Sequence, residues 1–94
     1  MLEELLSYRA KLIEDIHWLQ TSQKEVPIGG VWHPKLATGI RNCNICLRTI
    51  DIVRTRKSDK REIIKDAIVT CDLMIKTVKI LKEKFQTTFP NDRS

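Results

Sequence analysis

The chain has 94 residues, and its 17 Lys and Arg residues against 12 Asp and Glu residues give a net charge of +5. This length fits one small domain spanning residues 1–94. With 41% apolar and 31% charged residues, the composition excludes collagen-like, low-complexity and disordered classes. No uncharged run is long enough to span a bilayer. The domain is therefore expected to be a soluble, basic, globular protein.

The cysteine count and the first residues favour a reducing compartment. Three cysteines are an odd number, and Glu3 and Glu4 stand where a secretory signal requires basic residues. We therefore expect reduced thiols, no disulfide framework and a cytoplasmic location.

The first periodic segment predicts a helix over residues 2–23. Leu5, Leu12 and Leu19 recur every seven residues, which is typical of an amphipathic helix. An apolar segment with two prolines and a Gly-Gly pair follows at 26–34 and breaks the helical pattern. Because this segment contains valine, isoleucine and tryptophan, we expect it to fold over the open end of the helices.

The second periodic segment predicts a helix over residues 34–56. Leu36, Cys43 and Ile50 repeat every seven residues and form a core stripe. Ile45 and Ile52 lie nearly opposite this stripe at 100° per residue. Two aligned isoleucines on a solvent-facing side indicate a second contact surface, which we interpret as an oligomer or partner interface.

The third segment predicts a helix over residues 59–86. Ile64, Cys71, Val78 and Phe85 repeat every seven residues, and polar residues follow Pro90. Residues 87–94 are expected to be a frayed tail. Three helices joined by short connections favour an all-α, antiparallel three-helix bundle, with self-association because so short a chain has a small core.

The positive charge is concentrated at the corner between the second and third predicted helices. Residues 41 to 65 contain eight basic and three acidic residues, so their net charge equals the whole excess of +5. A helix N-terminus beside such a cluster favours anions. The candidate anion or nucleic-acid site comprises Arg41, Arg48, Arg54, Arg56, Lys57, Lys60 and Arg61. A solvated turn that only maintains solubility is the alternative.

The cysteine pair in the second predicted helix has the C-x-x-C spacing of a metal half-site or a redox pair. Cys43 and Cys46 lack two further ligands at metal-binding spacing, and no strand precedes them as a redox motif requires. Both sulfurs fall on the core stripe, as does Cys71 of the third segment. We therefore interpret all three as core residues and expect no metal.

The remaining candidates give no catalytic constellation. His17 and His33 have no nucleophile or paired carboxylates beside them, and no phosphate-binding glycine loop is present. We expect no enzymatic activity and no cofactor. Trp18 lies away from the leucine stripe, so it either packs under the 29–32 loop or serves as an exposed interface anchor.

Two functions remain open from the sequence. The first is a non-catalytic, self-associating binding protein that holds nucleic acid, or a nucleotide phosphate at a subunit interface, on its basic corner. The second is an inhibitor or adaptor, of the kind found in phages and mobile elements, whose helices dock on a larger host protein. Neither hypothesis involves a membrane.

Overall fold

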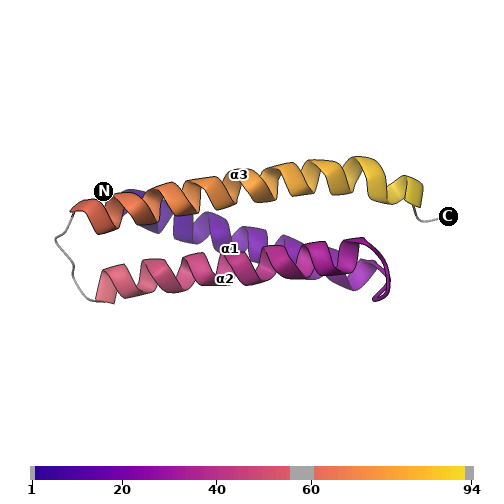
Figure 1. The fold of residues 1–94 in the computed structure, drawn as a ribbon, viewed down its shortest axis with the longest axis horizontal. Helices are drawn as coiled ribbons and strands as arrows, with labels where there is room; N and C mark the ends of the chain where they lie inside the picture. The colour runs from indigo at the N-terminus through magenta and orange to yellow at the C-terminus, as the bar shows by residue number, and fades with distance from the viewer. Residues whose placement is uncertain (1, 56–60, 93–94) are drawn as a thin grey trace.

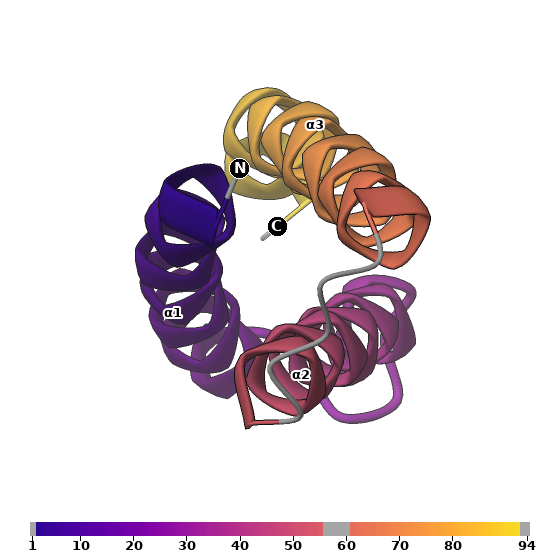
Figure 2. The same cartoon turned by 90° about the vertical axis from the view of Figure 1, so that its left-hand side faces the viewer.

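The computed structural model describes residues 2–55 and 61–92, with side chains described for 3–55 and 61–88. It contains three helices, α1 (Leu2–Glu25), α2 (Trp32–Thr55) and α3 (Arg61–Asp92). No strand occurs in these two ranges. α2 runs antiparallel to α1 and α3 (Figure 1), and the end-on view shows the three helices at the corners of a triangle (Figure 2). The predicted all-α three-helix bundle is confirmed.

The bundle is a narrow rod measuring 53 × 19 × 16 Å. Its length follows from α3, because 32 residues at a rise of 1.5 Å span about 48 Å. Each helix packs against both others. A rod this thin has a single central core and a large outer surface on every helix.

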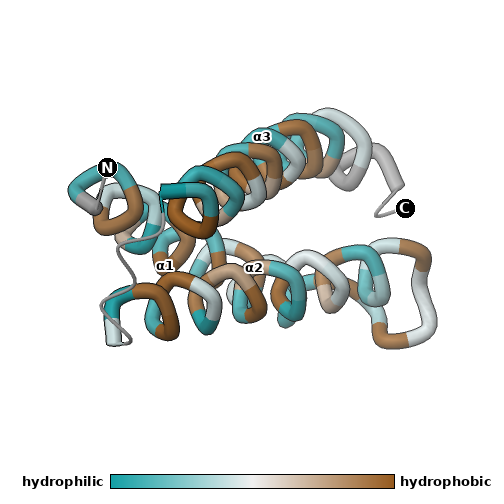
Figure 3. The backbone as a smooth tube through the Cα atoms, turned by 60° about the vertical axis from the view of Figure 1, so that its left-hand side comes forward, coloured by the Kyte–Doolittle hydropathy of each residue, from teal (hydrophilic) through white to brown (hydrophobic). Residues whose placement is uncertain are grey.

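The core is made of the seven-spaced rows that the sequence predicts. Hydrophobic and hydrophilic residues alternate within the turns of each helix (Figure 3), and the buried apolar residues of the three helices form one core cluster. The fully buried row of α1 is continuous with equivalent rows on the other two helices. These rows are Leu5, Leu12 and Leu19 on α1; Leu36, Cys43 and Ile50 on α2; and Cys71 and Val78 on α3.

The helix boundaries differ from the predicted ones in three places. α1 ends at Glu25, two residues beyond the predicted end. α2 begins at Trp32, two residues before the predicted start, so Pro34 lies within its first turn, where proline is tolerated. α3 continues to Asp92 and includes most of the predicted tail. Thr87 supports this extension, because its Oγ1 donates a hydrogen bond to the Glu83 carbonyl at 3.0 Å.

The connection between α1 and α2 covers the end of the bundle only in part. Val26 is buried, whereas Ile28 and Val31 are exposed, so the expectation that this segment folds over the core is wrong for these two residues. The reason is a tight turn in which the Gly30 amide donates to the Pro27 carbonyl at 3.0 Å. Trp32 of the same segment does cover the end as expected, and its ring meets Phe85 edge-to-face at 5.3 Å.

Candidate functional site

The outer face of α2 brings together four residues that the sequence analysis assigned to two different roles. Arg41, Ile45, Arg48 and Ile52 fall within about 60° of one another around the helix axis. All four are exposed, with Ile45 at 55% and Ile52 at 44%. Their predicted exposure is confirmed, while their role in binding stays a prediction.

Two adjoining surface hollows run along this face. One of 470 Å³ lies around Ile45, and one of 720 Å³ lies around Ile52. Asn44 and Arg48 line both hollows, so they form one continuous strip. This strip presents arginine donors, an amide and apolar contact area side by side.

The charge of α2 sets it apart from its neighbours. Four basic residues against one acidic residue give the helix a net charge of +3, whereas three basic and five acidic residues give α1 a net charge of −2. The single acid, Asp51, accepts a hydrogen bond from Arg9 Nε at 3.2 Å and is occupied by that ion pair. Within the described residues, no carboxylate lies within 4.0 Å of Arg41 or Arg48. Both arginines are therefore available to an anion.

The predicted basic corner is described only in part. Arg54 is exposed at the end of α2, where it lines a further hollow with Asp51 and Thr55, and Arg61 is exposed at the first residue of α3. The other members of the predicted cluster, Arg56, Lys57 and Lys60, lie outside the described residues. The described part of the cluster thus extends along α2 instead of being confined to the turn.

Trp18 packs within the bundle. Its ring is half-buried, meets Phe85 edge-to-face at 5.5 Å, and lies 5.4 Å from Lys82 Nζ. Of the two predicted alternatives, packing under the 29–32 loop and exposure as an interface anchor, the first is nearer to the structure. The aromatic partner of the ring is Phe85, however, and not a residue of that loop. The interface role of Trp18 stays a prediction.

The three cysteines are buried in the core as predicted. Cys43, Cys46 and Cys71 are free thiols. Burial, with a smaller contribution from Asp15, raises the pKa of Cys43 to about 12, and burial raises the pKa of Cys71 to about 11. Thiols with raised pKa are poor nucleophiles and poor metal ligands at neutral pH. In the described ranges, no group of three or more His, Cys, Asp or Glu residues is placed to hold a metal ion.

A buried carboxylate on α1 was not predicted. Asp15 is 1% exposed and accepts a hydrogen bond from Lys82 Nζ at 2.9 Å, while its Oδ2 atom has no partner among the described residues. A sequence signal exists, because Tyr8, Asp15 and Ser22 form a second seven-spaced row beside the leucine row. An acid in such a row is placed toward the core.

An apolar row on the outer face of α3 was also missed. Val69, Leu73 and Ile80 are 65%, 63% and 53% exposed. They lie within about 40° of one another and opposite the core residues Cys71 and Val78. This row is more exposed than the isoleucine pair of α2, and both acidic and basic side chains surround it.

Comparisons of the chain with family models, with curated proteins and with solved structures find no match. In the described part of the chain, no helix combines the length and hydropathy that crossing a membrane requires.

Proposed function

We propose that the protein is a non-catalytic binding protein that holds a nucleic acid along the outer face of α2. The observation that carries this proposal is the pair of exposed arginines, Arg41 and Arg48, that no described carboxylate neutralises. Seven residues on a helix place them about 10 Å apart on one side. Guanidinium groups bind phosphate through several directed donors.

The rest of the α2 face suits the same partner. Asn44 lies between the two arginines in the sequence, lines both hollows and offers an amide for hydrogen bonding. Ile45 and Ile52 provide apolar contact for sugars and base edges. No aromatic residue lines either hollow, so base stacking contributes little and phosphate contacts dominate. Binding is therefore expected to depend strongly on salt and weakly on sequence.

A charge-matched pair of double variants tests this proposal. Arg41→Glu with Arg48→Glu changes the charge by four units, and so does Lys24→Glu with Lys84→Glu on exposed positions of α1 and α3. Anisotropy of labelled duplex DNA and single-stranded RNA measures binding at low salt. The arginine pair should weaken binding by at least about 100-fold, because two lost charged hydrogen bonds at about 1.5–3 kcal/mol each total about 3–6 kcal/mol.

The lysine pair is the control, and its effect should be several-fold smaller. Equal losses from both pairs would show that only net charge matters and would contradict a site on α2. Failure of the unmodified protein to bind either nucleic acid would contradict the function itself.

We assign self-association to the outer face of α3. An α2–α2 contact would bring Arg41 and Arg48 of two copies together, which like-charge repulsion opposes. The α3 row has mixed charges beside it, including Asp66 and Lys84, and therefore tolerates a second copy. Exposed apolar rows of this kind are typical of protein–protein contacts.

The mass of the protein in solution tests this assignment. Leu73→Glu with Ile80→Glu should convert an oligomer to a monomer, and Ile45→Glu with Ile52→Glu is the matched control on α2. All four positions are exposed, so the variants should fold. A monomeric unmodified protein at micromolar concentration, or dissociation caused by the α2 pair instead, would contradict it. If the protein captures a larger host protein, and this capture requires the α3 row, the adaptor function would be supported. That result would also contradict self-association through the α3 row.

A further inference from the structure

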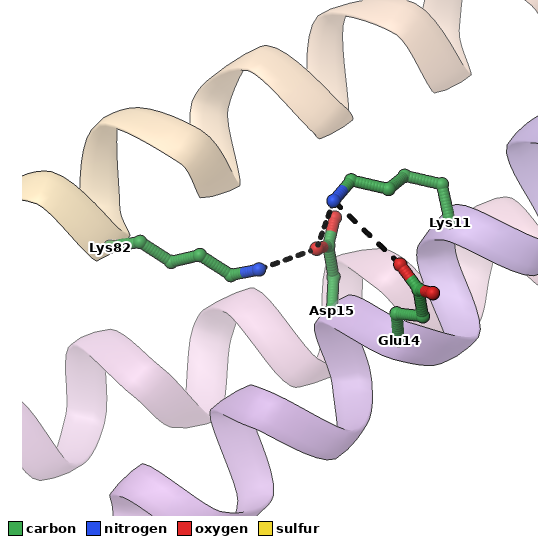
Figure 4. Close-up of polar contacts among 4 residues, drawn as sticks. All are labelled: Lys11, Glu14, Asp15 and Lys82. Carbon is green, nitrogen blue, oxygen red and sulfur yellow. Dashed lines mark hydrogen bonds and ion pairs between the residues drawn. The ribbon is translucent and has the colours of Figure 1, made fainter.

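A pocket of 330 Å³ lies between α1 and α3, away from the α2 face. It is lined by three lysines, one aspartate and one isoleucine: Lys11, Lys79, Lys82, Asp15 and Ile75. The Asp15 carboxylate rises from α1 into the space between Lys11 and Lys82 (Figure 4). Three cations and one anion give the lining a net charge of +2, with the exposed Glu14 at the rim, 3.8 Å from Lys11 Nζ.

The two oxygens of Asp15 are in different situations. Oδ1 accepts a hydrogen bond from Lys82 Nζ at 2.9 Å and lies 3.8 Å from Lys11 Nζ. Oδ2 is buried and accepts no hydrogen bond from a described residue. Leaving a buried charged acceptor unpaired is costly, so an atom in this situation favours a ligand that brings a donor.

The cations and the free acceptor together define the ligand. The lysines favour a small dianion, whereas Oδ2 repels an oxyanion that has no proton. We propose that this pocket binds inorganic hydrogen phosphate, whose P–O–H group donates to Asp15 Oδ2 while its charged oxygens accept from Lys11, Lys79 and Lys82. The Lys82–Asp15 bond orients the carboxylate for that donor.

This chemistry separates the pocket from the α2 face. The phosphodiesters of nucleic acids have no proton to donate, and neither does sulfate at neutral pH. A phosphate monoester, with a second pKa of about 6, has lost its proton near pH 8. Hydrogen phosphate keeps one proton under the same conditions. The pocket is thus expected to select free phosphate over all three.

Titration calorimetry with sodium phosphate, sodium sulfate and glycerol phosphate near pH 8 tests the proposal. Phosphate should bind at least about 10-fold more tightly than the other two, the ratio that one charged hydrogen bond produces. Tighter binding of glycerol phosphate would assign the pocket to monoesters and would overturn the proposal. No heat from phosphate near 1 mM, or equal heats from phosphate and sulfate, would also overturn it.

Two variants locate the site. Asp15→Asn replaces the acceptor-only group with an amide that also donates, so the phosphate-to-sulfate ratio should fall to about one. Lys79→Met removes an exposed pocket cation and should weaken phosphate binding several-fold, whereas Lys84→Met on the same helix should not. If Asp15→Asn unfolds the protein, the comparison of Lys79→Met with Lys84→Met still tests the site. Equal phosphate affinities of these two lysine variants would contradict it. These readouts do not depend on nucleic-acid binding.

Discussion

The pair formed by Asp15 and Lys82 predicts a large effect from a single substitution. Lys82→Met keeps the length of the side chain but leaves the carboxylate of Asp15 buried, with Lys11 at 3.8 Å as the remaining cation. At a separation of 2.9 Å, the lost attraction is about 6 kcal/mol for an effective dielectric constant of 20. Lys11 Nζ, at 3.8 Å, still attracts the carboxylate and offsets part of this loss. We expect a loss of about 3 kcal/mol.

Urea unfolding monitored by tryptophan fluorescence measures this loss, and the melting temperature should fall by roughly 12 °C or more. Asp15→Leu with Lys82→Met should recover most of the stability, because no unpaired charge remains.

The exposed Lys79→Met is the matched control and should change stability by less than about 0.5 kcal/mol. A loss below that value for Lys82→Met would contradict a stabilising role of the buried Asp15–Lys82 pair.

Three further predictions concern substitutions of core residues. Because the folded-state pKa of Cys43 is raised from 9.0 to about 12, stability should be lost as the pH rises between these values, and Cys43→Ala should flatten that dependence in urea titrations; an unchanged alkaline slope would contradict it. Gly39→Val should cost about 1–3 kcal/mol, because even a Cβ atom there lies 3.3 Å from both Leu19 methyl carbons; a melting temperature at or above that of the unmodified protein would count against this packing. Phe85→Leu removes edge-to-face contacts with both tryptophans and should cost about 1–3 kcal/mol with a loss of near-ultraviolet circular dichroism; an unaltered spectrum would argue against the aromatic cluster.

The helices and the core were predictable because burial in a bundle follows a periodic pattern. The rows through Leu12 and Cys43 are fully buried, as their spacing predicts, and the row through Val78 is buried except at Ile64, which is partly exposed. Ile45 and Ile52 were placed on the outer face by the same geometry. Helix ends were less predictable, because the start of α2 at Trp32 depends on aromatic packing against Phe85, which lies far away in sequence.

The two surfaces that the sequence did not reveal depend on contacts between helices. The burial of Asp15 requires Lys82, which is 67 residues away, and no local pattern links them. The outer row of α3 at Val69, Leu73 and Ile80 was hidden because the stronger core row of the same helix accounts for most of its apolar residues. The basic residues Arg41 and Arg48 were predicted from the sequence, whereas the hollows that join them to Ile45 and Ile52 became clear only from the structure.

The most direct test of the α2 face is the dependence of nucleic-acid affinity on salt. The slope of log K against log salt counts phosphate contacts at about 0.9 per contact on duplex DNA. Replacing Arg41 and Arg48 by alanine should reduce the magnitude of this slope by about 1.8, whereas replacing Lys24 and Lys84 by alanine should leave it unchanged. An identical slope for both double variants would contradict the proposed face.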